Sequence, residues 1–255
     1  MLTRHIISIG GGRIRATGKR PPQTTAIDEA IVQATGKRRP RALFIPTASL
    51  DDEEYRDAFV EQYGQLLGCR VDQLLLYRDR PSWKALRERI LNADLIYVGG
   101  GNTLRMMKLW RQLGVVRYLN QARKQGCVQA GLSAGAICWF RFGNSDSRSY
   151  SSPGDATLIR VTGLDYVDAT CCPHYDAEKN REPGLRHMMT RTAGVAVALD
   201  NCAAIEIKND QYRILTSKRG ARAYRVYWSA GVYYKERLKR GWQLLTELTD
   251  KRIRY

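Results

Sequence analysis

The sequence has 255 residues, of which 44% are hydrophobic and 26% are charged. This length allows one sizeable core, and no stretch approaches the roughly 18 uninterrupted apolar residues of a membrane span. The apolar run near the amino terminus is only a few residues long, and no small-residue cleavage site follows it. We therefore expect a cytoplasmic protein without a membrane partner.

The formal net charge is +17, with the basic excess densest over residues 208–255. A basic surface attracts nucleic acid, anionic membranes or acidic small molecules. No nucleic-acid-binding motif accompanies the charge, so we expect a solvated basic face and no nucleic-acid partner. The six cysteines show no C-x-x-C spacing, which favours reduced, buried thiols over a disulfide framework. The segment "CCPH" at 171–174 lacks a second ligand pair, so we expect neither a metal nor another cofactor.

Buried strands alternate with helices over the first 140 residues. Continuous apolar strands in this alternation indicate a parallel sheet with helices on both faces, and hence an α/β fold. After about residue 155 the pattern changes to shorter β-rich segments, which would add mixed edge strands. No linker or repeat interrupts the chain, so we expect a single domain over residues 1–255. In chain order we expect strands over 5–12, 41–49, 71–77, 94–101 and 127–133, and helices over 24–36, 51–68, 82–93, 102–114, 118–126 and from 134 onward.

Ligands of open parallel sheets bind beyond the carboxyl ends of the strands. Four glycine- or hydroxyl-rich segments fall at such ends: "GGG" at 10–12, "PTAS" at 46–49, "GGGNT" at 99–103 and "GLSAG" at 131–135. The last one has the strand–Gly-x-Ser-x-Gly–helix frame that can expose a serine nucleophile. A plain packing turn is the alternative, but the strand context favours Ser133 as a nucleophile.

An exposed serine at this turn needs oxyanion donors and a base. The backbone N–H of Ala134 follows the serine at the start of a helix, and the glycine segment with Gly100 and Gly101 is suited to provide a second donor. Of the three histidines, His5 precedes the first strand and His187 has the setting of an ordinary helix residue. By elimination, His174 is the expected base. Because no histidine follows residue 187, the order Ser–His–acid is favoured over that of the α/β-hydrolases.

Together these segments resemble the peptidase E family, which includes cyanophycinase-like hydrolases. The matching pieces are "IGGG", "LFIPTAS", "YVGGGNTLRMM", "GLSAGAICWF", "CPHYDAEKNR" and "VALDNCAAIEI", in order over residues 5–210. The resemblance implies a flavodoxin-like or class I glutamine amidotransferase-like sheet. It also implies a serine peptidase that cleaves dipeptides with an N-terminal aspartate without metal or cofactor. Ser133 would be the nucleophile, His174 the base, and Gly101 with Ala134 the oxyanion donors.

The resemblance also supplies substrate-binding candidates. Arg181 matches an arginine that meets the substrate's side-chain carboxylate, although a surface arginine beginning a helix is an equal alternative. We expect Asn102 to contact the substrate as well. Members of the family are often dimers, so a homodimer is a further expectation. Alternative functions are hydrolysis of another acidic or isoaspartyl-type amide, or a catalytically weak relative that binds an anion or nucleic acid.

The chain departs from the family at the third triad position. Where the family has a glutamate, alignment sets Asn201, which can orient a histidine but cannot stabilise imidazolium by charge. Asp200 would take this place if the loop shifted by one residue, and Glu206 is a weaker candidate. The sequence leaves these alternatives open, and with them the possibility of weakened activity.

Overall fold

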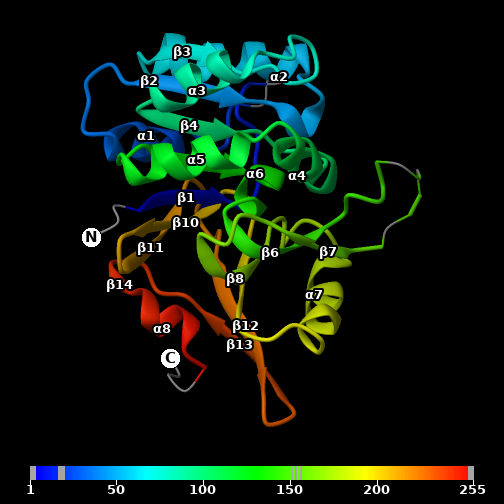
Figure 1. Cartoon of the computed structure of the whole chain (residues 1–255). Coiled ribbons are helices and arrows are strands. Elements are labelled where there is room, and N and C mark those ends of the chain that lie inside the picture. The colour runs from blue at the N-terminus through cyan, green and yellow to red at the C-terminus, as the bar shows by residue number, and fades with distance from the viewer. Residues whose placement is uncertain (1–3, 17–20, 151, 153, 156, 252–255) are drawn as a thin grey trace.

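The computed structural model describes residues 4–16, 21–150, 152, 154, 155 and 157–251. The expected domain of 1–255 therefore includes residues that lie outside the described ranges. The strands form two sheets, one of eight strands and one of six. Figure 1 shows the amino-terminal strands and their helices in the upper part of the view, and the second sheet below them.

The eight-stranded sheet has the order β14-β11-β10-β1-β5-β4-β2-β3. Its strands from β1 to β3 pair in parallel, whereas β10, β11 and β14 add an antiparallel edge. This confirms the expected α/β fold with a mixed edge. The strands are β1 (His5–Ile9), β2 (Arg41–Ile45), β3 (Arg70–Gln73), β4 (Leu95–Val98), β5 (Val128–Leu132), β10 (Ala203–Lys208), β11 (Gln211–Thr216) and β14 (Gln243–Leu244).

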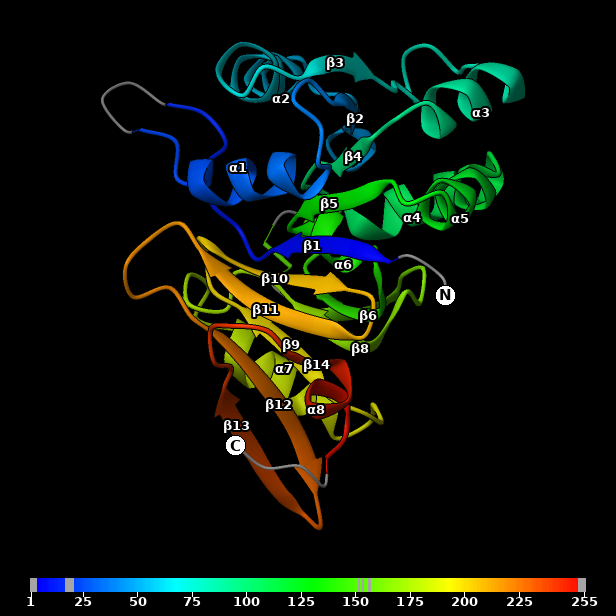
Figure 2. The ribbon, with the colours of Figure 1, turned by 90° about the vertical axis from the view of Figure 1, so that its left-hand side faces the viewer.

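Helices cover both faces of the parallel strands, as the edge-on view of Figure 2 shows. Side chains alternate along each strand, so Ile6 joins one core and Ile7 the other. The first core packs against α3, α4 and α5, and the second against α1 and α2. The helices are α1 (Thr25–Ala34), the 3₁₀ turn η1 (Thr47–Ser49), α2 (Glu53–Phe59) with its π-helical continuation η2 (Val60–Leu66), α3 (Trp83–Leu91), α4 (Thr103–Gln112), α5 (Val115–Lys124), α6 (Ala134–Ile137), α7 (Arg181–Met189) and α8 (Leu245–Thr249).

The second sheet has the order β13-β12-β9-β8-β6-β7. The expected helix from residue 134 is correct only for its first turn, because the buried strand β6 begins at Phe140. Strands β6, β8 and β9 pair in parallel, so the second sheet also has carboxyl ends where side chains gather. Its strands are β6 (Phe140–Ser145), β7 (Ile159–Thr162), β8 (Val167–Cys172), β9 (Ala196–Leu199), β12 (Ala223–Ser229) and β13 (Val232–Arg237).

The two sheets meet at the carboxyl end of β1. There the Gly10 carbonyl accepts the N–H of His174 at 3.0 Å, and the Gly11 carbonyl accepts the N–H of Cys202 at 2.8 Å. These backbone bonds fix the loops after β8 and β9 against the first sheet. They bring the expected site residues of both sheets to one place. All six cysteines are buried free thiols, which agrees with the expectation from their spacing.

Candidate functional site

Ser133 occupies the sharp turn between β5 and α6. Its backbone has φ 56° and ψ −108°, a conformation that is strained for a residue with a side chain, and its N–H donates to the Ile9 carbonyl at 3.0 Å. Both glycines of the frame are required by close approach. A Cβ on Gly131 would lie 2.3 Å from the Gly135 carbonyl oxygen, and one on Gly135 would lie 2.0 Å from the Val98 carbonyl oxygen. The G-x-S-x-G spacing therefore builds the turn that presents the serine.

A chain of hydrogen bonds joins Ser133, His174 and Asn201. His174 Nε2 lies 2.9 Å from Ser133 Oγ, and His174 Nδ1 lies 2.8 Å from Asn201 Oδ1. An amide oxygen can only accept, so Nδ1 carries the proton and Nε2 accepts from the serine hydroxyl. This is the tautomer that a general base needs. The three residues follow β5, β8 and β9, so the chain spans both sheets.

The carboxylates of the two acidic alternatives bind partners other than His174. The Asp200 carboxylate accepts the backbone N–H of Arg222 at 2.9 Å. Burial, aided by the nearby Asp176, raises the pKa of Asp200 to about 6. Glu206 lies on β10 between His5 and Arg213. Its Oε1 is 2.7 Å from His5 Nε2, and its Oε2 is 2.5 Å from Arg213 Nε. Burial would raise the pKa of Glu206, but these two hydrogen bonds outweigh it and hold the pKa below its usual value.

Sequence reasoning missed two residues that hold this arrangement. Asp176, in the "PHYD" segment, accepts the backbone N–H of Asn201 at 2.7 Å and so fixes the amide that faces the histidine. Gly11 leaves the space in which that pair meets, because a Cβ there would lie 2.0 Å from Asn201 Oδ1 and 2.4 Å from His174 Nδ1. The "GGG" segment at 10–12 was a signal for Gly11, although the sequence did not show which side chains approach it.

Gly100 and Gly101 differ in what their N–H groups do. The N–H of Gly100 donates to the Tyr55 hydroxyl at 3.2 Å. Among the described residues, no acceptor forms a hydrogen bond with the N–H groups of Gly101 or Ala134. Gly101 has φ 134°, and a Cβ there would lie 2.3 Å from the Ala48 carbonyl oxygen. A Cβ on Gly100 would lie 3.4 Å from that of Ser133, so this loop runs beside the serine.

Asn102 caps the helix that follows this loop. Its Oδ1 accepts the backbone N–H of Arg105 at 2.9 Å, and its Nδ2 donates to the Ser147 carbonyl at 3.1 Å. The residue is 3% exposed. Through these two hydrogen bonds, the Asn102 side chain caps α4 and holds the glycine loop against the segment after β6.

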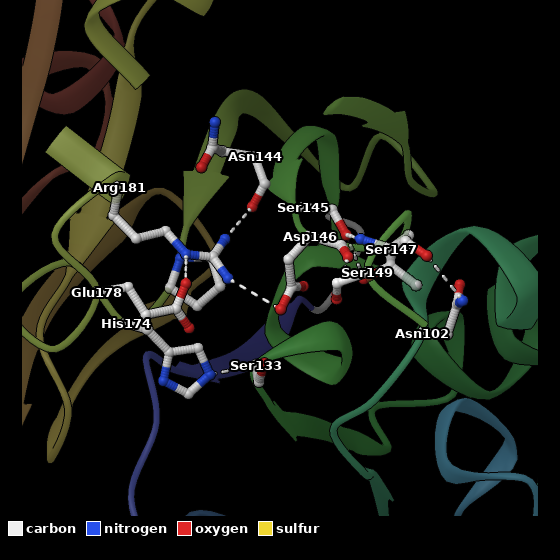
Figure 3. A network of polar contacts seen from close by, with 12 residues as sticks. Asn102, Ser133, Asn144, Ser145, Asp146, Ser147, Ser149, His174, Glu178 and Arg181 are labelled. Atoms are coloured by element: carbon white, nitrogen blue, oxygen red, sulfur yellow. Dashed lines mark hydrogen bonds and ion pairs between the residues drawn. The ribbon is translucent and has the colours of Figure 1, made fainter. Parts of the chain in front are cut away.

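Arg181 lies at the start of α7 with 1% of its surface exposed. Its Nε donates to Glu178 at 2.6 Å and its Nη1 to the Asn144 carbonyl at 2.8 Å, while Nη2 lies 3.5 Å from Asp146. Figure 3 shows the guanidinium enclosed by these partners near His174 and Ser133. Burial lowers the pKa of Arg181, but the hydrogen bond to Glu178 and the nearby carboxylates outweigh it. The arginine is thus already paired with two carboxylates, each about a third exposed.

Nothing in the described part of the chain forms a group of three or more histidine, cysteine or acidic side chains that could hold a metal ion. Cys171 and Cys172 are buried, and burial raises the pKa of both thiols. Within the same residues, no helix is both long and apolar enough to cross a membrane.

Comparisons with known proteins bear on the family and the fold of this chain. The model of peptidase family S51 matches residues 6–215. The chain is 36% identical over 225 residues to the uncharacterized peptidase YgaJ of Bacillus subtilis (strain 168), covering 88% of this chain and 92% of that protein. It is 30% identical over 129 residues to peptidase E of Salmonella gallinarum, which covers 50% of this chain and 49% of that protein. A solved peptidase from an acI-B1 Actinobacterium shares the fold with a TM-score of 0.73 at 16% identity, covering 95% of this chain and 97% of that one.

Proposed function

Because the chain belongs to peptidase family S51 and is therefore a serine peptidase, we propose that it hydrolyses short peptides with Ser133 as nucleophile and His174 as general base. The observation that carries this proposal is the hydrogen-bond chain from Ser133 through His174 to Asn201. Its distances fall in the range that proton transfer requires, and its tautomer is the productive one.

The reaction follows the usual two steps of acyl transfer. Ser133 Oγ attacks the peptide carbonyl carbon while its proton passes to His174 Nε2. The negative charge on the carbonyl oxygen is held by the N–H groups of Gly101 and Ala134, which have no acceptor among the described residues. His174 then gives the proton to the leaving nitrogen, and the C–N bond breaks. Water, activated by the same histidine, releases the acyl group from Ser133.

Gly100 contributes to the oxyanion site indirectly. Its N–H is bound to Tyr55, so it holds the loop in place while Gly101 faces the developing charge. Asn102 acts in the same way through its two hydrogen bonds and shapes the wall that the substrate meets. Asn201 is the orienting group in this proposal. Asp200, which is hydrogen-bonded to the backbone of Arg222, is not.

The preferred substrate is a short peptide with an N-terminal aspartate, whose side-chain carboxylate would meet Arg181. A planar guanidinium suits two contacts with a carboxylate. Since Arg181 is paired with Glu178 and Asp146 in the unliganded enzyme, the substrate must compete with these side chains. The substrate carboxylate therefore has to replace Glu178 or Asp146 on Arg181. This competition makes the affinity for aspartyl peptides lower than it would be if Arg181 were unpaired.

The test is a panel of dipeptides with wild type, Ser133→Ala and His174→Ala. We expect Asp-Leu to be the best substrate and both variants to lose hydrolysis while keeping the circular dichroism spectrum. A fluorophosphonate probe should label only the protein that retains Ser133. Equal turnover by wild type and Ser133→Ala would show that this serine is not the nucleophile.

A further inference from the structure

A pocket of about 440 Å³ lies beside the loop that carries Gly101 and Asn102. It is formed between the first turns of α4 and the segment that follows β6. The residues lining it that matter here are Asn102, Leu104, Arg105, Lys108, Arg148 and Asp155.

The pocket gathers three cations against one carboxylate. Among the described residues, no carboxylate lies within ion-pair distance of Arg105, Lys108 or Arg148. This differs from Arg181 and Arg213, which are paired with Glu178 and Glu206. Hydrogen bonding from Thr157 and, to a smaller extent, the charge of Arg148 lower the pKa of Asp155, so Arg148 already interacts with this carboxylate. Three cations facing a single carboxylate still leave a local positive potential that attracts an anion.

Polar contacts join the pocket to Asn102 and to the surroundings of Arg181. The segment Ser145–Arg148 directs the Asp146 side chain to Arg181, and its Ser147 carbonyl accepts from Asn102 at 3.1 Å. Ser147 Oγ also accepts the backbone N–H of Leu104 at 3.1 Å. Arg148, the next residue, lines the pocket. Residues 145–148 thus contact Arg181 through Asp146 and line the basic pocket through Arg148.

Figure 3 shows Ser133 with Arg181 to one side and Asn102 to the other. If the N-terminal residue of the peptide lies toward Arg181, the part beyond the scissile bond extends toward Asn102. An extended chain advances about 3.3–3.6 Å per residue, so each residue beyond the bond carries the leaving part further in this direction.

We propose that this pocket binds a carboxylate on the leaving part of the peptide, through Arg105, Lys108 and Arg148. The inference rests on the proposed function and adds a second anchor to it. The carboxylate is either the C-terminal group of a dipeptide or an acidic side chain. In both cases the pocket would favour short acidic peptides over long neutral ones, because a carboxylate placed there meets three cations that otherwise face only Asp155.

The test compares Asp-Leu, Asp-Leu-amide and Asp-Glu-amide as substrates for wild type, Lys108→Gln and Arg148→Gln. For wild type, we expect KM for Asp-Leu to be at least about fivefold lower than for Asp-Leu-amide, the size of a favourable exposed ion pair. Each variant should reduce this ratio toward one. A low KM for Asp-Glu-amide would identify the side chain as the carboxylate that binds, whereas a low KM for Asp-Leu alone would identify the C-terminus.

Matched controls are Lys124→Gln and Arg117→Gln, which remove cations from α5 outside the pocket. They should leave the acid-to-amide ratio at the wild-type value. The inference would be overturned if wild type showed the same KM for Asp-Leu, Asp-Leu-amide and Asp-Glu-amide. It would also be overturned if the pocket variants left unchanged the KM difference that wild type shows. If Ser133→Ala retained hydrolysis, the proposed function itself would fail, and this outcome is distinct from an unchanged ratio.

Discussion

The amide oxygen of Asn201 lies 2.8 Å from Nδ1 of His174, at the position where serine peptidases of this family are expected to carry a carboxylate. The amide fixes the ring and its tautomer as well as a carboxylate would. It does not compensate the positive charge that the ring acquires when Ser133 loses its proton. In the proposed mechanism, the base is therefore oriented by an amide, which carries no countercharge for the imidazolium.

This arrangement predicts that Asn201→Asp raises kcat on Asp-Leu by at least about tenfold, since a carboxylate stabilises the imidazolium. Asn201→Ala removes the acceptor of Nδ1–H, and we expect it to lower kcat by about 100-fold. Steady-state kinetics at neutral pH measure both. Asn92→Asp, at the exposed end of α3, is the matched control and should leave kcat unchanged. A lower kcat for Asn201→Asp would contradict the assignment of Asn201.

The second prediction concerns Asp200 and pH. Its pKa of about 6 in the folded protein exceeds the ordinary value of 3.8, so the folded state holds more protons than the unfolded state between these pH values. Its contribution to the free energy of unfolding is therefore complete below the ordinary value and is lost as pH rises to about 6. Asp200→Asn retains an acceptor for Arg222 and should remove this part of the pH dependence. Urea unfolding of both proteins across that range measures it, and parallel pH profiles would refute the prediction.

Gly11→Ala should abolish most activity with less effect on stability. The added methyl group would overlap both Asn201 Oδ1 and His174 Nδ1, so the two side chains must separate. We expect kcat to fall by about 100-fold, comparable with loss of the orienting group. Gly64→Ala in η2 is the control, since its Cβ would lie 3.3 Å from a flexible Val71 methyl group far along the chain from the site. Crystal structures or kinetics showing an intact His174–Asn201 pair in Gly11→Ala would argue against this account.

Glu178→Gln should improve the binding of aspartyl substrates. It removes one of the carboxylates that occupy Arg181, so the substrate carboxylate competes with fewer charges. We expect KM for Asp-Leu to fall by about threefold, while KM for Ala-Leu stays constant. Glu182→Gln, which removes a carboxylate paired with Lys235 on the same helix, is the control. A parallel change for both substrates would show that Arg181 does not read the aspartate side chain.

Local sequence patterns were sufficient to predict the α/β fold, with its parallel strands and helices on both faces. They also singled out Ser133 and His174, because both residues follow buried strands in distinctive segments. A strand–Gly-x-Ser-x-Gly–helix frame is determined by contacts between neighbours in the chain, such as those of Gly131 with Gly135. Residues that depend only on such short-range geometry can be read directly from the sequence.

Tertiary structure decided the rest. A shift of one residue in the loop after β9 would place Asp200 instead of Asn201 beside His174. The position of this loop is set by backbone and side-chain contacts with Asp176, Gly11 and Arg222, which lie far apart in the sequence. The second sheet, which carries His174 and Asn201, forms through strand pairings that alternation of polar and apolar residues does not specify. The contact between Arg181 and Asp146 likewise forms only after the segment that follows β6 packs against α7, whereas Glu178 lies three residues before Arg181 in the sequence. Sequence alone thus singled out Ser133 and His174, whereas long-range packing determined that Asn201 lies against His174 and that Asp146 lies against Arg181.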